Sequence, residues 1–164
     1  MSTSDPAHGE PPETHGAPEP PGAGRPGHTH RLITDVPGNA AAAGFAHAVV
    51  PAAGRTVYLA GQTALNPDGG LEGEDIVAQL DRAAGNLLRA LAAAGGEPHH
   101  LVSLQLFVTD VEAYRARLRD LGGVWRAHFG RHYPAMGLFG VARLFDEDAL
   151  VELMGVAVVP PAEP

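Results

Sequence analysis

The amino-acid sequence predicts an α+β fold in which two helices cover one face of a single β-sheet. Two stretches repeat their apolar residues with the period of an α-helix, and several shorter stretches have the alternation or the β-prone composition of strands. These segments follow one another in the order β-β-α-β-α-β-β. Because each helix has one mainly apolar face, both helices are expected to pack on the same side of the sheet.

Only the chain after residue 30 is expected to fold. Residues 1–30 hold 7 of the 15 prolines, 5 of the 21 glycines and almost no large apolar side chain. Such a segment cannot bury enough surface to offset the entropy of ordering. We therefore predict a disordered tail over 1–30, one domain over 31–160 and a short tail over 161–164. The first tail also lacks the apolar central run of a signal peptide.

The domain is expected to begin with a β-hairpin. Two β-prone runs, Ala46–Val50 and Thr56–Ala60, flank the sequence Pro-Ala-Ala-Gly at 51–54. A short loop of this composition between two such runs is typical of a hairpin. The sequence Asn-Pro-Asp-Gly-Gly at 66–70 then predicts a turn before the next element.

A first helix is predicted over Glu74–Ala94. Acidic side chains at 72, 74 and 75 lie at its N-terminal end, where the helix dipole favours negative charge, and Gly95 and Gly96 end it. Its apolar face consists of Val77, Leu80, Ala84, Leu87, Leu88 and Leu91.

A strand and a second helix are predicted next. Leu101–Asp110 alternates apolar side chains on one face, and Asp110 can cap the helix that follows. The pair Gly122-Gly123 lies within this helix, where glycine is unfavourable, and predicts a kink or close packing there. The apolar face of this helix consists of Tyr114, Leu118, Leu121, Trp125 and Phe129.

Two further strands, Met136–Leu144 and Leu150–Val158, are predicted to form a final hairpin, and Pro134 ends the second helix. The last strand carries valine and leucine on both of its faces. The sheet is therefore expected to have an apolar second face. A closed homo-oligomer is the usual way in which a face of this kind is covered.

The composition excludes several kinds of chemistry. There is no cysteine, which rules out a thiolate nucleophile and a zinc-thiolate site and is compatible with the cytoplasm, the expected compartment. All 11 basic residues are arginine, so a Schiff base or pyridoxal phosphate held by lysine is excluded, and no cofactor is expected. A net charge of −8 argues against nucleic acid as a partner, and no apolar run is long enough to span a membrane.

Histidines offer a weak indication of a metal site. His128 and His132 are four residues apart, a spacing that can place two imidazoles on one metal ion. No third ligand accompanies them, so no metal site is predicted.

Four motifs resemble, in their order and spacing, those of the Rid (reactive intermediate deaminase, or YjgF-like) superfamily. They are VYLAGQTALNPDGGLEGEDIVAQ, LLRALAAAGG, LVSLQLFVTDVEAY and YPAMGLFGVARLFDEDALVELMGVAVV, and the resemblance covers Leu32 to Val159. It implies a chorismate-mutase-like fold and a homotrimer with a ligand cleft between each pair of subunits. It also implies hydrolysis of small enamines or imines to 2-keto acids and ammonia, which is the activity of the deaminase-type members.

The sequence departs from that family at most positions of the familiar pocket. The arginine of the Pro-Ala-Arg-Ser motif, which is thought to hold the substrate carboxylate, corresponds to Met136. A thioether cannot pair with a carboxylate, so the sequence predicts a pocket rebuilt from polar to apolar. The tyrosine, serine and asparagine positions correspond to Phe45, Ala60 and Gly122, while Glu152, Gln62 and His47 (where relatives often carry glutamine) keep polar side chains.

These residues form the predicted site. Glu152 and His47 are the candidate catalytic groups, with the carboxylate positioning water and the imidazole acting as base or hydrogen-bond donor. Met136, Phe45 and Leu138 would favour a larger substrate without the usual carboxylate. We expect a Rid-type hydrolase with altered substrate choice that acts on a small metabolite. The alternatives are a trimer that binds a small molecule without turnover and a structural or chaperone-like trimer.

Overall fold

The structure is a computed structural model that describes residues 30–161. The two predicted tails therefore lie outside the described residues, except for His30 and Pro161 at their inner ends. His30 is buried, its Nε2 donates to the carbonyl oxygen of His100 (3.1 Å), and its Nδ1 accepts from the amide of Ala52 (3.1 Å). The described part of the chain thus begins at a residue that is held by two hydrogen bonds.

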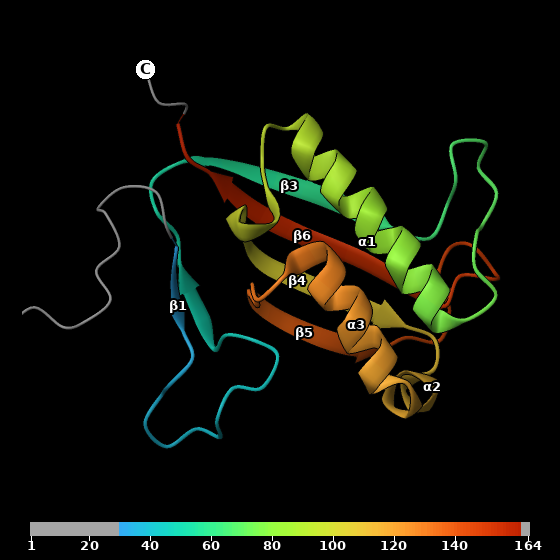
Figure 1. Cartoon of the computed structure of the whole chain (residues 1–164), viewed down its shortest axis with the longest axis horizontal. Coiled ribbons are helices and arrows are strands. Elements are labelled where there is room, and N and C mark those ends of the chain that lie inside the picture. The colour runs from blue at the N-terminus through green and yellow to red at the C-terminus, as the bar shows by residue number, and fades with distance from the viewer. Residues whose placement is uncertain (1–29, 162–164) are drawn as a thin grey trace, which may run out of the picture.

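A four-stranded sheet forms the centre of the molecule (Figure 1), with the strand order β3-β6-β4-β5. All neighbouring strands are antiparallel except β4 and β5, which are parallel. Two short strands, β1 and β2, form a separate antiparallel pair. The strands are β1 (Arg31–Ile33), β2 (Ala48–Val50), β3 (Arg55–Gln62), β4 (Leu101–Val108), β5 (Ala135–Gly140) and β6 (Val151–Val159).

Neither predicted hairpin is formed. The strand β3 pairs with β6 across the length of the chain, whereas β2 pairs with β1. The strand β4 lies between β5 and β6, so these two strands are not neighbours. Turn residues show where the chain bends, but the pairing of strands is decided by which of them can share a buried face.

Helices α1 (Ile76–Ala93) and α3 (Leu118–Phe129) lie side by side on one face of the sheet, as predicted. Asp75 caps α1 by accepting hydrogen bonds from the amides of Val77 (3.0 Å) and Ala78 (2.9 Å). The bond from Ala78, together with the guanidinium of Arg117, lowers the pKa of the Asp75 carboxyl. A short 3₁₀ turn, η1 (Pro98–His100), precedes β4.

The predicted second helix is divided at Arg117 into α2 (Val111–Ala116) and α3. Asp110 caps α2 as expected, through a 2.9 Å hydrogen bond from the amide of Ala113. The kink or close packing predicted at Gly122-Gly123 is wrong, because α3 continues through both glycines. A Cβ at Gly123 would meet no described atom within 4 Å.

The two faces of the sheet differ in what covers them. The helix-covered face holds the core, which includes Leu104, Leu106, Val151 and Leu153. The other face is apolar but open in the single chain, as the sequence predicted. Its exposed side chains include Tyr58 (81% exposed), Phe139 (49%) and Met154 (41%), and Phe139 stacks on Phe107 with the ring centres 5.6 Å apart.

The outer strand β3 has a register shift between Leu59 and Gln62. Residues before and after this irregularity do not follow one simple alternation, so Gln62 returns to the helix-covered side of the sheet. In the described part of the chain, no helix is both long and apolar enough to cross a membrane.

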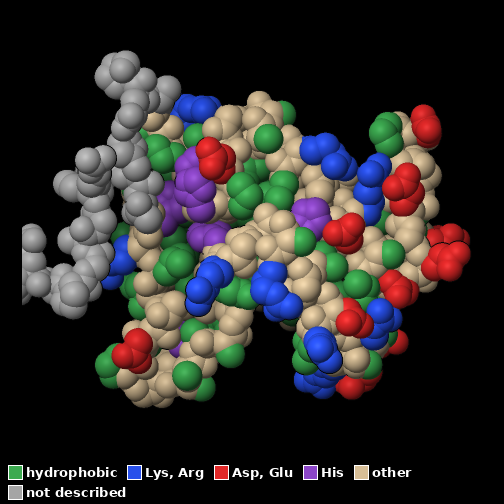
Figure 2. Space-filling view, in the orientation of Figure 1, with side chains coloured by type: hydrophobic (Ala, Val, Ile, Leu, Met, Phe, Trp, Pro, Cys, Tyr) green, Lys and Arg blue, Asp and Glu red, His purple; other side chains and the backbone are tan. Residues whose placement is uncertain are grey.

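Four histidines lie near one another, and Figure 2 shows histidine side chains gathered at the end of the molecule opposite the turn at 66–70. This histidine cluster consists of His30, His99, His100 and His132; the rings of His99 and His100 have centres 4.1 Å apart. Burial, and then the charge of His99, lowers the pKa of His100. Burial likewise lowers the pKa of His132. Both rings therefore favour the neutral form.

Candidate functional site

An apolar hollow of about 260 Å³ lies between the helices, the start of β5 and the loop at 43–44. We call this the apolar hollow. Met136 and Gly122, two of the predicted substrate-binding residues, both line it, and no Asp, Glu, Arg, Lys or His is among its lining residues. The larger side chains of its wall include Leu80, Leu121, Trp125 and Tyr133.

The start of β5 positions Met136. Pro134 is buried, β5 begins at Ala135, and Met136 pairs with Leu104 in the parallel ladder. Because Leu104 faces the helices, Met136 does so too, and its half-buried side chain packs against the core. Within the single chain the thioether thus lies under the helices. The crevice between protomers in which we expected it would have to be an extension of this hollow.

Gly122 leaves room in the wall of the hollow. An added Cβ there would meet only the Nη1 atom of Arg126, at 3.4 Å. An asparagine at this position, as the family resemblance implies for deaminases, would extend a polar amide toward the hollow. Glycine adds no hydrogen-bonding group of its own to this part of the wall, and the exposed Arg126 guanidinium lies beside it.

Aromatic residues supply the most rigid part of the hollow. Trp125 stacks on Tyr133, with ring centres 5.5 Å apart and planes 8° apart, and its Nε1 donates to the carbonyl oxygen of His132 at 3.2 Å. Burial raises the pKa of the Tyr114 hydroxyl, which is therefore neutral and has no hydrogen-bond partner among the described residues. It is available to a ligand.

The sequence showed Tyr114 and Trp125 only as members of an apolar helix stripe. That pattern is common to core and pocket residues, so it did not single them out as site residues. Leu118, from the same stripe, is 58% exposed and lies at the hollow instead of in the core.

The segment that contains Phe45 and His47 passes beside the start of β5. Ala46 forms a bridge with Ala135, and its amide donates to the carbonyl oxygen of Pro134 at 3.0 Å. The His47 Nε2 lies 3.0 Å from the carbonyl oxygen of Ala40, and its ring meets that of Phe45 edge-on at 5.2 Å. Neither side chain lines the apolar hollow, to which this segment contributes Ala43 and Gly44.

Glu152 lies on the other face of the sheet. It is opposite Phe107 in the ladder, and its carboxylate passes over Gly61 of β3, where an added Cβ would collide with Oε1. No described residue donates a hydrogen bond to this carboxylate or forms an ion pair with it. Glu152 and Met136 are thus separated by the sheet within one chain.

The remaining predicted residues are dispersed. Ala60 is exposed within the irregular part of β3, and Gln62 lines a different, polar hollow. Leu138 is two residues beyond Met136 on β5 and is 37% exposed. In the described residues no three His, Cys, Asp or Glu side chains gather as a metal site would require.

Comparison with known proteins gives consistent matches. The family model described as Endoribonuclease L-PSP matches residues 37–159. Protein DfrA of Myxococcus xanthus is 32% identical over 115 residues, which is 70% of this chain and 84% of that protein.

Solved structures of Rid proteins share the fold. The conserved Rid-family protein YyfB of Yersinia pestis is 30% identical with a TM-score of 0.70, over 80% of this chain and 99% of that chain. RidA of an Antarctic Psychrobacter species is 27% identical with a TM-score of 0.57, over 79% and 99% of the two chains.

Proposed function

Because this chain belongs to the Endoribonuclease L-PSP family, which includes the Rid proteins, we propose that it binds a small, largely apolar enamine or imine and hydrolyses it. Membership of the family supports a function that involves a small metabolite. The nature of that metabolite and the reaction are our proposal. No cofactor takes part, and the cytoplasm is the proposed compartment.

One observation carries the choice of substrate: no charged side chain lines the apolar hollow beside Met136. An ionised carboxylate beside Met136 would lose its hydration without gaining a cation from the lining residues, which costs several kcal/mol. An apolar or aromatic group would instead gain contact with Trp125 and Tyr133. The Tyr114 hydroxyl can supply a single hydrogen bond to a polar atom of the ligand.

An enamine would first become the imine by moving a proton from nitrogen to carbon, and the proposed reaction is then addition of water to the C=N carbon followed by loss of the nitrogen. The water oxygen forms the new C–O bond, the C–N bond breaks, and the protons of water end on the departing ammonia, which leaves a carbonyl product. The Glu152 carboxylate would accept a hydrogen bond from the attacking water and pass its proton to the nitrogen. His47 or backbone groups would assist at the rim.

This chemistry requires a second copy of the chain. Within one chain Glu152 and Met136 lie on opposite faces of the sheet, so Glu152 of one subunit would have to reach the hollow of another. We propose a homotrimer in which the open sheet face, with Tyr58, Phe139 and Met154, is buried between subunits. Burial of such side chains is the usual source of association energy.

A second candidate function is binding without turnover. It is favoured by the separation of Glu152 from the hollow and by the His47 ring, whose Nε2 is held by the carbonyl of Ala40. In that case the protein would be a trimer that holds an apolar metabolite.

Competition with semicarbazide tests the proposal. An amine oxidase would generate an imine from an arylalkylamine, and an amino-acid oxidase would generate a carboxylate-bearing imine. The protein should reduce semicarbazide capture of the first imine more than of the second. Glu152→Gln should abolish this effect, whereas Glu147→Gln, an exposed carboxylate before β6, should leave it unchanged.

The variant Met136→Arg supplies the reverse test. A guanidinium in the hollow should shift the preference toward the carboxylate-bearing imine. If the parent protein binds the aromatic imine or its amine but leaves capture unchanged, the second candidate function replaces the first. If the parent prefers the carboxylate-bearing imine, the apolar substrate proposal is wrong.

A further inference from the structure

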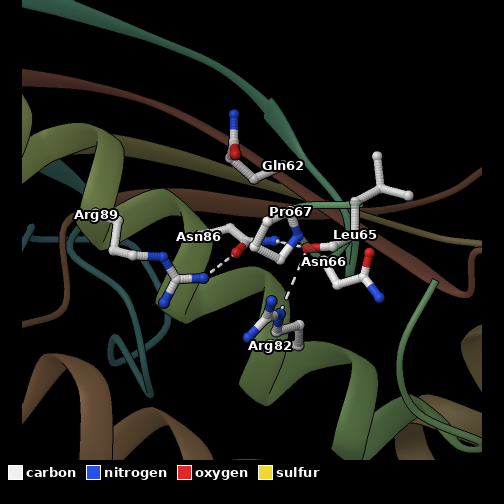
Figure 3. A pocket seen from close by; sticks show the side chains of 7 residues that line it. All are labelled: Gln62, Leu65, Asn66, Pro67, Arg82, Asn86 and Arg89. Atoms are coloured by element: carbon white, nitrogen blue, oxygen red, sulfur yellow. Dashed lines mark hydrogen bonds between the residues drawn. The ribbon is translucent and has the colours of Figure 1, made fainter. Parts of the chain in front are cut away.

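A second hollow, of about 300 Å³, lies on another side of α1 (Figure 3). It is formed between this helix and the segment that follows β3. Its lining includes two arginines, Arg82 and Arg89, and three amide side chains, Gln62, Asn66 and Asn86, but no carboxylate. We call it the arginine hollow. It is separate from the apolar hollow and plays no part in the proposed reaction.

The helix aligns the polar groups of this hollow. Arg82, Asn86 and Arg89 are spaced by four and three residues, so they lie on one stripe of α1. Figure 3 shows Arg82 and Arg89 extending from the helix with Asn86 between them. The two guanidiniums therefore border the same space.

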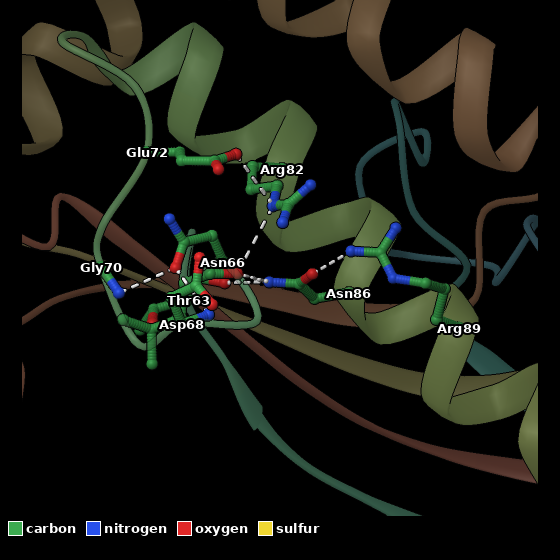
Figure 4. Close-up of polar contacts among 9 residues, drawn as sticks. Thr63, Asn66, Asp68, Gly70, Glu72, Arg82, Asn86 and Arg89 are labelled. Carbon is green, nitrogen blue, oxygen red and sulfur yellow. Dashed lines mark hydrogen bonds and ion pairs between the residues drawn. The ribbon is translucent and has the colours of Figure 1, made fainter.

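Asn86 holds this stripe against the loop. Its Nδ2 donates to the carbonyl oxygens of Thr63 (2.8 Å) and Leu65 (2.9 Å), and its Oδ1 accepts from Nη2 of Arg89 (Figure 4). Both amide hydrogens and the amide oxygen are thus engaged. The Arg89 guanidinium is consequently oriented before any ligand arrives, which reduces the entropy lost on binding.

The two arginines differ in how far their charge is neutralised. The Nε of Arg82 lies 3.3 Å from a carboxylate oxygen of Glu72 and 3.4 Å from the carbonyl oxygen of Leu65. Arg89 has no carboxylate within ion-pair distance among the described residues. The hollow and its rim therefore retain about one uncompensated positive charge, and it is on Arg89.

We propose that the arginine hollow binds the oxyanion group, carboxylate or phosphate, of a small molecule. Arg89 would donate to two of its oxygens, which is the geometry in which guanidinium binds such groups most strongly. The guanidinium of Arg82 would contact the same oxyanion from the other side of the hollow. Asn66 would donate from the loop: its Oδ1 accepts from the amides of Asp68 and Gly70, and no described group accepts from its Nδ2.

Titration with simple anions tests the proposal. Inorganic phosphate and acetate would be added to the full chain at constant ionic strength set with chloride, and binding followed by calorimetry and by the thermal unfolding midpoint. Saturable binding of either anion is expected. Phosphate alone would identify a phosphate site and acetate alone a carboxylate site. A response equal to that of chloride would overturn the proposal.

Variants locate the site. Arg89→Gln should weaken binding at least tenfold, and Arg82→Gln should weaken it less, because Arg82 is already paired with Glu72. Arg119→Gln removes the same charge from an exposed position on α3 and should leave the affinity unchanged. Equal affinity for Arg89→Gln and the parent would show that the anion binds elsewhere. Circular dichroism of each variant would verify that its fold is intact.

Discussion

The apolar hollow and the arginine hollow share a helix but differ in what their walls do for the fold. The wall of the first includes core residues such as Leu80, Leu121 and Trp125. The wall of the second consists mainly of polar side chains at the surface of α1 and of the loop after β3. Substitution of a core residue in the first hollow should therefore have the largest effect on stability, and substitution of an exposed arginine in the second should mainly change binding.

The two hollows also differ in where arginine side chains lie. The resemblance to the Rid superfamily places an arginine at the position of Met136, yet the apolar hollow has none. Guanidiniums line a cavity that is formed by other elements. The chain can thus accept an anionic group, but in a place that the deaminase motif does not indicate.

The largest effect is expected for Trp125→Ala. The side chain is 7% exposed, stacks on Tyr133 and packs at a tilt against Phe129, so its removal should cost roughly 3–5 kcal/mol of unfolding free energy. Urea denaturation would measure this. Leu118→Ala, at the exposed side of the same hollow, is the matched control and should cost less than about 1 kcal/mol. A loss below about 1 kcal/mol for Trp125→Ala as well would show that this wall of the hollow is not part of the core.

Asn86→Ala should have an intermediate effect. It removes two hydrogen bonds to backbone carbonyls and one from Arg89, which should cost about 1–2 kcal/mol. It should also weaken phosphate or acetate binding, because Arg89 loses its orientation. Unchanged stability together with unchanged anion affinity would contradict the anchoring role of this amide.

A lower pH should reduce the free energy of unfolding, because it protonates histidines such as the half-buried His132, which lies next to the apolar hollow. Burial lowers the pKa values of His100 and His132 below the ordinary 6.5. The unfolded chain therefore binds protons that the folded chain does not, and stability should fall as the pH drops from about 6.5 toward the lowered folded-state values.

Urea midpoints at pH 7.5 and pH 5.5 would measure this loss. The Asp75 carboxyl has a pKa below its ordinary value of 3.8, so its protonation changes the stability only at more acidic pH and does not affect the comparison of these two midpoints. His132→Gln should reduce the difference between the two midpoints. A protein that is more stable at pH 5.5 would refute the assignment.

The smallest stability effect is expected for Arg89→Gln. The side chain is exposed and has no carboxylate partner among the described residues, so the change in unfolding free energy should be within about 0.5 kcal/mol. The same variant should lose most of its anion affinity. A loss of stability as large as that of Trp125→Ala would remove the distinction between the two hollows.

Local sequence signals predicted the apolar faces of the helices and the Asp110 cap, but not that Asp75 is the cap of α1 or that the second helix is divided at Arg117. The apolar period of α1 and the position of Asp110 depend on neighbours within one or two turns, and these neighbours are adjacent in sequence. Strand pairing was not predictable in the same way. The partner of Arg55 in the ladder is Val159, and the turn residues between β2 and β3 carry no information about it.

The candidate site was only partly predictable for a related reason. The sequence AMGLFG of β5 has apolar residues on both faces, so it did not reveal that Met136 faces the helices. The register shift in β3 moved Gln62 away from the side expected from alternation. The arginine stripe of α1 could not be predicted to be a binding site from the sequence, because three polar residues on the outer side of a helix are usually a solvated surface.

The irregularity between Leu59 and Gln62 has a consequence for behaviour at high concentration. β3 is the outermost strand on its side of the sheet, and its outward backbone groups are a template on which a foreign strand could add. The shift interrupts that template after a few residues. It thereby limits how far fibril-like stacking of one molecule on the next can extend.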